Sequence, residues 1–491
     1  MTDVVLVGLG GAGGIAADVL TAAGAEVVAL EAGPRRSAAE MTFDEIRNDV
    51  REWLAEPKAR GELPTFRYRE DEPAGESPHP MLMANGVGGS TLHYPGLSAR
   101  LDSYDFRDWP IGYAELEPYY ALTERAIGVT SDLRRTGWTE LMSDAATRLG
   151  WHPHPAPAAI DAARCTYCGF CTCNGCHVMA KGSTDATVIP RAEASGRLHV
   201  RTGARVVRIE ARRGRATGVT YVQDGRTLFQ PAAAVLLGAF VYENARLLLL
   251  SGLGGDQVGA GYMAHATPFV HGRFPGRRLN LFNGLWSQAT CVRDFDAAML
   301  TASHEFKPIA ASGLHPPSVP RWGAAWKEWL RANAQSVGTV NAQLATLPYE
   351  HNRLDLDPRR RDPHGVPVVR VTHRLGEHER QGYAFMLARL EEWLREAGAD
   401  LTWAPDGLLV DARHCYGGTT MGDDPATSVV DRWGFVHGMP NLGVLGASTF
   451  CSTGSVNPTL TVQALAWRTA TRLAGSDMFS DTKTTVVEEN A

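Results

Sequence analysis

The sequence predicts an α/β protein with two or three cores, or one large interleaved pair, and three observations lead to this prediction. The chain has 491 residues, and single domains run to roughly 100–200 residues, so more than one hydrophobic core is expected. Its composition, 44% hydrophobic and 21% charged residues, is ordinary for a folded globular protein. The N-terminal segment alternates strand-like and helix-like runs, which is typical of a parallel sheet covered by helices.

The N-terminal unit reads as strand, glycine turn, helix and strand. Residues 3–7 (DVVLV) and 26–30 (EVVAL) are short apolar runs suited to buried parallel strands. Residues 15–23 between them have a helical pattern, and Glu31 ends the second strand. The turn that follows the first strand contains four glycines of a GxGxxG pattern: Gly8, Gly10, Gly11 and Gly13.

Each part of this pattern suits a dinucleotide. The glycines allow a tight turn, close approach of the backbone to a pyrophosphate, and close packing of helix on strand, while the helix N-terminus offers N–H groups to the phosphates. Glu31 is placed to bind a ribose 2′-hydroxyl, and it would repel a 2′-phosphate. The alternative is a glycine-rich turn without a ligand.

Charge and hydropathy exclude other partners. The net charge of −6 gives no reason to expect nucleic acid. No apolar run approaches the ~18 residues of a membrane span, and the N-terminus lacks the basic segment of a secretion signal. We therefore expect a cytoplasmic, reducing environment without membrane contact.

Later segments carry further patterns in a fixed order. A second glycine cluster, Asn85–Tyr94, precedes an ENARLLLLSG run at Glu243–Gly252 and an NRLD segment at Asn352–Asp355. The stretch from His414 to Leu473 holds several more, including Asn457-Pro458-Thr459. With these motifs the chain resembles the glucose–methanol–choline (GMC) family of FAD-dependent oxidoreductases, nearest its pyranose oxidase, gluconate dehydrogenase and C-glycoside oxidase branches.

The resemblance implies a Rossmann-type FAD-binding domain built from discontinuous segments, beside an α+β substrate domain with a mainly antiparallel sheet, as in p-hydroxybenzoate-hydroxylase-like folds. The FAD-binding segments would be 1–43, 81–110, 190–260 and 434–476. The substrate-binding segments would be 44–80, 111–189, with a Cys-rich loop at 165–176, and 261–433, followed by a tail at 477–491.

The residue patterns agree with this division. Short apolar runs that predict strands precede a helical pattern at 241–250, and they lie at 198–202, 204–209, 216–222 and 234–237. Helical patterns at 322–332 and 378–397 are mixed with strand-like runs at 338–347 and 367–372.

The resemblance also places cofactor contacts along the chain. The second glycine cluster would contact the flavin through Asn85, Gly88, Gly89, Ser90 and His93. Val206 would lie near the adenine, and Gly446 and Ala447 near the pyrophosphate or ribitol. The helix that starts after Asn457, Pro458 and Thr459 would direct its positive end at the flavin C2 carbonyl, where it stabilises the reduced anion.

Alcohol oxidation by hydride transfer needs a base for the hydroxyl proton, and a neutral histidine suits this task. The resemblance puts His414 in the base position and Asn457 in the position of its partner. Here Thr420 stands where the family usually has Arg, and Gly418 where it usually has Thr. A one-residue deletion would move His414 out of register, so packing beside the flavin is its alternative role.

Two features of the cofactor region stay open. In pyranose-oxidase-like relatives the histidine at the position of His93 is bonded covalently to the flavin, whereas related dehydrogenases have a histidine there without the bond. The segment 165–176 has five cysteines in a C-x2-C-x2-C-x-C-x2-C spacing, with Cys165, Cys168, Cys171 and Cys176 as the candidate ligands. That spacing fits an iron–sulfur cluster, a zinc site, or reduced structural thiols in a tight loop.

The expected function is FAD-dependent oxidation of a primary or secondary alcohol of a sugar, glycoside or aminoglycoside-like polyol. One alternative is a non-redox family member such as a hydroxynitrile lyase. Another is a flavin and iron–sulfur subunit that passes electrons to a partner cytochrome. Trp286, Trp322, Trp326 and Glu305 are candidates for sugar contacts, with core or surface positions as the alternative.

Overall fold

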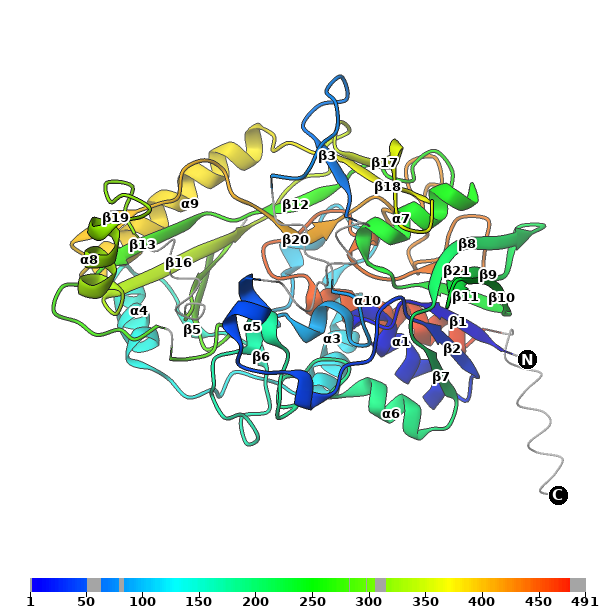
Figure 1. The fold of residues 1–491 in the computed structure, drawn as a ribbon, viewed down its shortest axis with the longest axis horizontal. Helices are drawn as coiled ribbons and strands as arrows, with labels where there is room; N and C mark the ends of the chain where they lie inside the picture. The colour runs from blue at the N-terminus through cyan, green and yellow to red at the C-terminus, as the bar shows by residue number, and fades with distance from the viewer. Residues whose placement is uncertain are drawn as a thin grey trace.

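The structure, a computed structural model, describes residues 2–50, 63–78, 84–281, 283–296, 298–304 and 315–476. It is an elongated molecule with a parallel sheet at one end and a large antiparallel sheet at the other (Figure 1). The predicted α/β fold is confirmed.

The parallel sheet has the strand order β21-β11-β1-β2-β7. Its strands are β21 (Leu442–Val444), β11 (Ala234–Leu237), β1 (Val4–Val7), β2 (Val27–Leu30) and β7 (Leu198–Arg201). Every residue of β1, β2, β11 and β21 is buried, as expected for parallel strands covered on both faces. Segments far apart in the sequence therefore build one sheet.

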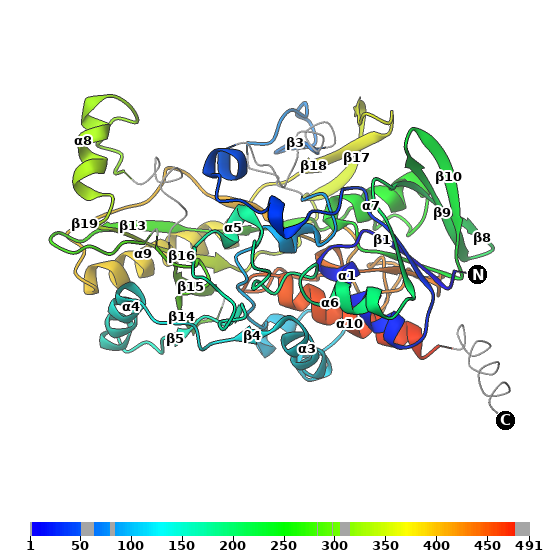
Figure 2. The ribbon, with the colours of Figure 1, turned by 60° about the horizontal axis from the view of Figure 1, so that its bottom comes forward.

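Helices α1 (Gly11–Ala22) and α10 (Thr459–Ala474) pack against each other beneath this sheet (Figure 2). On the outside, α3 (Tyr113–Ile127) packs against α10 and α6 (Val188–Ala194) against α1. Helix α1 begins four residues before its predicted start, because glycines with poor intrinsic helix propensity form its first turn under tertiary packing.

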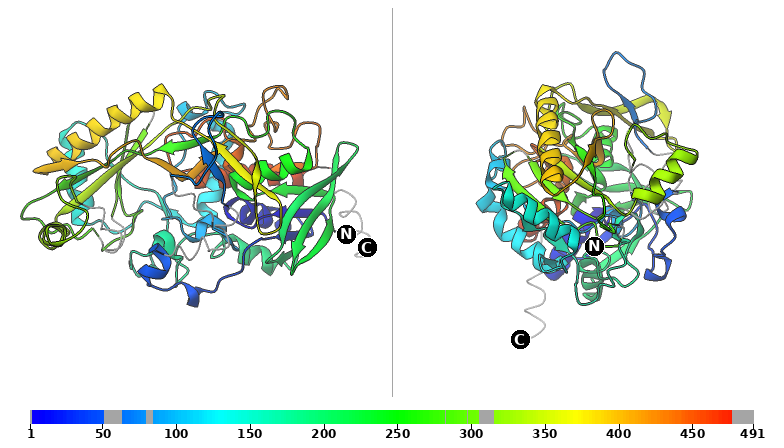
Figure 3. Two further views of the ribbon diagram at one scale, coloured as in Figure 1. Left: turned by 45° about the horizontal axis from the view of Figure 1, so that its top comes forward. Right: turned by 90° about the vertical axis from the view of Figure 1, so that its left-hand side faces the viewer.

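A second layer lies over the other side of the parallel sheet. It contains α7 (Phe240–Ser251) and an antiparallel sheet of β8 (Arg205–Arg212), β9 (Arg215–Gln223) and β10 (Arg226–Pro231), which forms the end of the molecule in the left view of Figure 3. Helix α7 packs on β8 and on a small sheet with the order β17-β18-β3. The strands of that sheet are β17 (Arg353–Arg361), β18 (Pro367–Thr372) and β3 (Thr65–Arg67).

The large sheet has the order β19-β13-β16-β15-β14-β5, and β12 joins it by pairing with both β16 and β20. Its strands are β19 (Leu401–Trp403), β13 (Phe269–Arg273), β16 (Val337–Leu344), β15 (Ala298–Ala302), β14 (Thr290–Phe295), β5 (His154–Pro155), β12 (Met263–Ala266) and β20 (Val410–Tyr416). Every pairing in it is antiparallel, as the sequence predicts.

One face of the large sheet is covered by α9 (Glu377–Glu396) and α4 (Gly137–Arg148), which also contact each other. On β16, the alternate residues Val340, Ala342 and Leu344 belong to the apolar cluster shared with these helices. Because side chains of a strand alternate between faces, the residues between them point to the other side of the sheet. That other side forms one wall of the cavity described below.

The remaining described elements are short or peripheral. They are the helices α5 (Cys171–Asn174) and α8 (Ala324–Asn333), the strands β4 (Val129–Thr130) and β6 (Ala158–Ala159), and the single turns η1 (Ala38–Glu40), η2 (Ile46–Val50), η4 (Gly89–Leu92), η5 (Ser103–Phe106) and η7 (Ala447–Thr449). Within the described parts of the chain, no helix has the length and apolar character needed to span a bilayer. The domain boundaries stated above stay a prediction.

Candidate active site

A cavity lies between the carboxyl ends of the parallel strands and the face of the large sheet opposite α9 and α4. Val7 and Leu30, the last residues of β1 and β2, line it from one side, and Phe269 and Gln343 of the large sheet line it from the other. Ligands of open parallel sheets bind at the carboxyl ends of the strands. The location alone therefore marks this cavity as the candidate site.

The first glycine turn forms the floor of the cavity with its backbone. Gly8 has φ +89°, and a Cβ there would lie 2.7 Å from the carbonyl oxygen of Gly238. Gly8, Gly10 and Gly11 line the cavity, whereas a Cβ on Gly13 would lie 2.1 Å from the oxygen of Gly8. Gly13 thus serves the close packing of α1 on the turn, which is the third role predicted for these glycines.

Glu31 lies at the end of β2 with 7% of its surface exposed, and it lines the cavity. Its Oε2 accepts from the amide of Leu9 at 2.9 Å, and its Oε1 accepts from those of Gly33 and Gly86 at 2.8 and 3.2 Å. Burial raises the pKa of this carboxyl, and the three amide hydrogen bonds oppose the rise. Oε2 can accept a second bond, so the carboxylate fits the ribose hydroxyl expected there.

The second glycine loop meets the first one. A Cβ on Gly89 would lie 2.8 Å from the Cα of Gly10, so only glycine allows this approach. Asn85, Gly89 and Ser90 line the cavity. Gly88, with φ +99°, caps the η4 turn and does not line the cavity; a Cβ there would lie 2.9 Å from Leu92.

His93 also lines the cavity, directly after η4. The backbone on both sides of it is held by a buried ammonium group. Lys181 Nζ donates to the carbonyl oxygens of Leu92 at 2.6 Å, Tyr94 at 3.1 Å and Cys171 at 2.7 Å. Lys181 therefore ties the Cys-rich loop to the segment that carries His93.

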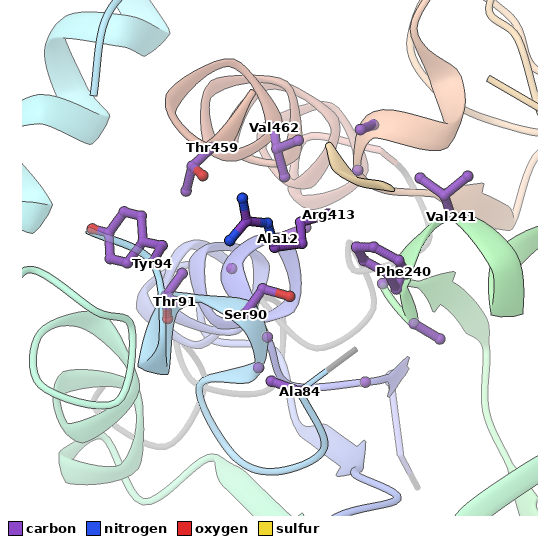
Figure 4. A pocket seen from close by; sticks show the side chains of 18 of the residues that line it. Ala12, Ala84, Ser90, Thr91, Tyr94, Phe240, Val241, Arg413, Thr459 and Val462 are labelled. Atoms are coloured by element: carbon purple, nitrogen blue, oxygen red, sulfur yellow. The ribbon is translucent and has the colours of Figure 1, made fainter. Parts of the chain in front are cut away.

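The N-terminal turns of α1 and α10 face the same cavity. Ala12, Thr459 and Val462 are seen around it in Figure 4. Gly446, Ala447 and Pro458 line it beside Thr459, and Val206 of β8 lines it near the adenine end expected from the sequence. Two helix N-termini make this wall electropositive, which suits the phosphates and the reduced ring of a flavin. The residues present thus fit FAD.

His414 of β20 and Asn457 before α10 meet in this cavity, although 43 residues separate them in the sequence. Asn457 Nδ2 lies 3.4 Å from His414 Nε2. On the other side of the ring, His414 Nδ1 lies 3.3 Å from Gln343 Oε1 and 3.2 Å from Nδ1 of His265. The structure therefore brings together the two residues that the sequence predicts as an acid–base pair.

The hydrogen bonds of His265 and Gln343 assign the proton on the His414 ring. His265 is fully buried, and its Nε2 lies 3.1 Å from the carbonyl oxygen of Gly454, which can only accept. With both rings neutral, His265 Nε2 carries the hydrogen and His265 Nδ1 is an acceptor. His265 Nδ1 can accept from His414 Nδ1 or from the Tyr416 hydroxyl at 3.3 Å, and the Gln343 oxygen, which can only accept, places the hydrogen of the His414 ring on Nδ1. The tautomer inferred from this network leaves the lone pair on His414 Nε2, beside the amide hydrogens of Asn457.

The cysteines of the loop at 165–176 are not among the described residues that line the cavity, although Thr172 of the same loop is. Burial raises the pKa of Cys171 to about 12, and burial, followed by the nearby Cys168 and Cys176, raises that of Cys165. The cysteines whose side chains the structure describes form no disulfide. Within the described residues, no group of three or more His, Cys, Asp or Glu is arranged to hold a metal ion.

Sequence reasoning missed several residues of the substrate wall. Asn341 and Gln343 of β16, Phe269 of β13 and Arg413 of β20 all line the cavity, and the Arg413 side chain extends into it in Figure 4. The signal for the first two was two amides at alternate positions of an otherwise apolar strand. Of the aromatic candidates, Trp286 lines the cavity.

The other candidates for sugar contacts lie elsewhere. Trp322 is 81% exposed just before α8, and Trp326 lies within that helix; neither is among the described residues that line the cavity. Glu305 lies outside the described residues.

The glycine turn with Gly8, Gly10 and Gly11, called the glycine cradle below, suits a dinucleotide and shares its cavity with the pair His414 and Asn457. This combination is typical of dinucleotide-dependent oxidoreductases. Family models described as GMC oxidoreductase match residues 13–267 and 348–466. The first of these alone spans more than half of the chain, so the protein belongs to the GMC oxidoreductase family. The family predicted from the sequence is confirmed.

Relatives match over nearly the whole chain. The chain is 28% identical to the gluconate 2-dehydrogenase flavoprotein of Pantoea cypripedii, over 95% of this chain and 92% of the relative. It is 29% identical to paromamine 6'-oxidase of Streptomyces fradiae, over 96% and 91%. It is 26% identical to the fructose dehydrogenase large subunit of Gluconobacter japonicus, over 95% and 97%.

The fold is similar to that of a solved structure, pyridoxine 4-oxidase from Mesorbium loti. The TM-score is 0.68 at 16% sequence identity, over 96% of this chain and 99% of that chain. The three relatives found by sequence are named as oxidases or dehydrogenases, which favours oxidation over the lyase alternative.

Proposed function

We propose that the protein oxidises an alcohol group of a polyhydroxylated small molecule, such as a sugar, glycoside or aminoglycoside-like polyol, with FAD as its cofactor. The observation that carries the proposal is the contact of His414 with Asn457 in the cavity whose other wall is the glycine cradle. The named relatives act on gluconate, paromamine and fructose, and this supports the substrate class.

FAD would be held by residues already in place. The glycine turn with Gly8 and the start of α1 would bind the pyrophosphate, Glu31 the ribose, and Ser90 and Thr459 would lie at the flavin end. When bound, FAD would supply the two-electron acceptor for the hydride that leaves the alcohol carbon. The electropositive end of α10 would favour the negative charge that the ring then gains.

The protein itself handles the proton. Asn457 Nδ2 would donate to the alcohol oxygen and hold it beside His414. His414 Nε2 would take the hydroxyl proton while the carbon–hydrogen bond breaks, so that the alcohol becomes a carbonyl group and loses two electrons and two hydrogens in total. Gln343 and His265 would stabilise the protonated imidazole ring of His414 by accepting from its Nδ1.

Anaerobic mixing of the purified protein with sugars, polyols and amino sugars tests this function. Substrate is expected to bleach the visible flavin bands, and a carbonyl product should form in equal amount. A colourless protein would contradict the cofactor, and a flavin that stays oxidised while substrate is consumed would show the lyase alternative. Reoxidation in air or only with a dye then separates an oxidase from a dehydrogenase.

We also propose that His93 contacts the flavin, because it lines the cavity and its backbone is anchored on both sides by Lys181. Covalent attachment is a separate expectation for this residue. Acid precipitation decides it, since a covalent flavin stays with the precipitated protein and is lost from it in His93→Ala, whereas a non-covalent flavin is released from both.

For the Cys-rich loop we propose a packing role with reduced thiols. Cys171 is buried with its carbonyl bound to Lys181, so this part of the loop supports the His93 segment. An iron–sulfur cluster that passes electrons to a partner cytochrome is the alternative, based on the shared loop of Cys165, Cys168, Cys171 and Cys176. Iron and sulfide analysis of protein purified without oxygen distinguishes the two roles.

A further inference from the structure

Two amide oxygens in the wall of the cavity have no hydrogen-bond partner among the residues that the structure describes. They are Oδ1 of Asn341 and Oδ1 of Asn457. Asn341 is 3% and Asn457 is 8% exposed, and both line the cavity. Leaving a buried acceptor unpaired costs on the order of 1–3 kcal/mol, so a ligand that brings a donor to each oxygen would be favoured.

The register of β16 explains why Asn341 faces the cavity. Its neighbours Val340 and Ala342 pack in the apolar cluster under α9 and α4, so Asn341 must point to the opposite face. The residue paired with it across the sheet, Phe269 of β13, lines the cavity as well. An amide and an aromatic ring thus stand side by side on the substrate wall.

The distance along β16 relates this oxygen to the base. Gln343, whose Oε1 lies 3.3 Å from His414 Nδ1, is two residues from Asn341 on the same face of the strand. Two residues of a strand span about 7 Å, at ~3.3–3.4 Å per residue. Asn457 stands directly beside the base, at 3.4 Å from His414 Nε2. The unpaired oxygen of Asn457 is therefore adjacent to the base, and that of Asn341 lies further along the substrate wall.

An alcohol with a single hydroxyl group cannot donate a hydrogen bond to these two amide oxygens. Its single hydroxyl hydrogen goes to His414 Nε2, and its carbon chain has nothing to donate to Asn457 Oδ1 or Asn341 Oδ1. A substrate with further hydroxyl or amino groups supplies both donors. A site that is built to hydrogen-bond a hydroxyl group rejects the analogue that lacks it, because the polar group of the protein then stays buried and unpaired.

We propose that the amide oxygens of Asn341 and Asn457 select substrates with at least one hydrogen-bond donor besides the reacting alcohol, and that Asn341 is a specificity residue that binds a donor remote from the reacting carbon. This inference rests on the proposed function and deepens it. Phe269 and Trp286, which line the same cavity, would cover the apolar face of the substrate.

The test compares steady-state kinetics of the flavin-loaded protein on three kinds of substrate. These are a hexose or hexitol that the protein oxidises, its monodeoxy and amino-deoxy analogues, and a primary alcohol of similar length with one hydroxyl. In the native protein, kcat/KM should fall about 10-fold to 100-fold when the donor that meets Asn341 is removed, which corresponds to the ~1–3 kcal/mol of an unpaired acceptor. An amino group in place of the removed hydroxyl should restore kcat/KM.

The variant Asn341→Leu should lower kcat/KM for the full polyol by the same factor, mainly through KM, and leave the single-hydroxyl alcohol and the deoxy analogue unchanged. Asn341→Ala provides the same comparison if the leucine variant loses its flavin. The matched control is Thr339→Val, on the same face of β16 two residues away; Thr339 bonds His271 and is not among the described residues that line the cavity. Thr339→Val should leave the ratio of kcat/KM between the full polyol and its deoxy analogue unchanged.

Equal losses for polyol and single-hydroxyl alcohol in Asn341→Leu would show a merely structural residue and overturn the proposal. So would a native protein that does not distinguish the deoxy analogues. A different failure, in which no alcohol bleaches the flavin of the native protein, would remove the proposed function itself, and the inference would fall with it.

Discussion

The two walls of the cavity are built in different ways. The cofactor wall consists mainly of backbone: glycine turns after β1 and before η4, and the first turns of α1 and α10. The substrate wall consists of side chains from β13, β16 and β20, which the antiparallel sheet places side by side. A backbone site needs residues that are contiguous in the sequence, so it leaves a short motif. A site of side chains depends on strand register and leaves only scattered residues.

The largest effect is expected from a change that breaks the backbone wall. Gly13→Ala would place a Cβ 2.1 Å from the oxygen of Gly8, which cannot move without opening the turn. We expect loss of bound flavin, measured by visible absorbance of the purified protein. The matched control is Gly137→Ala at the start of α4, where a Cβ meets nothing within 4 Å. Full flavin content in Gly13→Ala would contradict the backbone role.

On the substrate wall, the central side chain is His414. His414→Ala removes the proton acceptor but leaves the glycine cradle intact, so flavin content should be normal and kcat should fall by about 10²–10⁴-fold, the usual contribution of a general base. Anaerobic flavin reduction in a stopped-flow instrument measures the step directly. His199→Ala, at an exposed position of β7, serves as the control. A normal reduction rate in His414→Ala would assign the base to another residue.

His265 contacts His414 and does not line the cavity, so we expect it to act on the reaction only through His414. Replacement by Leu removes an acceptor for the hydrogen on His414 Nδ1, and kcat should fall by about 10-fold to 100-fold, from the ~1–3 kcal/mol of a lost buried partner. His265→Gln keeps a donor and an acceptor and should recover part of the loss. The pH profile of kcat/KM should shift in the leucine variant and return toward the native profile in the glutamine variant. If only thermal stability changes, His265 is a packing residue.

The smallest effect concerns His271, further along the same face of the sheet, where its Nδ1 lies 2.7 Å from Thr339 Oγ1. Burial, with a smaller contribution from His315, lowers the pKa of His271 from 6.5 to about 4. Below pH 6.5 the unfolded chain therefore binds a proton that the folded chain does not. The stability should fall as the pH drops from 6.5 to 4, by up to about 3 kcal/mol at ~1.4 kcal/mol per pKa unit.

Denaturant unfolding of the native protein and of His271→Phe at pH 7.5 and pH 4.5 measures this contribution. The phenylalanine variant keeps the ring beside Trp403 and has no proton to bind, so its stability should depend less on pH. Equal pH dependence in both proteins would show that His271 is not the titrating group. Catalysis at pH 7.5 should be the same in both.

More of the cofactor wall than of the substrate wall could be predicted from the sequence. The cofactor wall is built from contiguous backbone, whereas the substrate wall is built from side chains of different strands. The glycines at 8–13, Glu31, the loop at 85–93 and the start of α10 were found as motifs, and they meet in one cavity. Asn341 and Gln343 alternate with apolar residues along β16, but nothing in the sequence shows that their face of this wholly buried strand lines a cavity. The position of His265 beside the base could not be predicted, since nothing in its own segment indicates that β12 pairs with β20 next to His414.

The fold class, the family and the glycine turn that lines the cavity could be predicted from the sequence alone, because these depend on local conformation: glycine torsion angles, apolar periodicity and helix starts. The tertiary structure was needed to show which nitrogen of His414 lies beside Asn457 and which amides line the cavity. Those features depend on pairings between β12, β13, β16 and β20, whose residues are separated by up to about 150 positions. Such register is fixed by the packing of the whole sheet under α9 and α4.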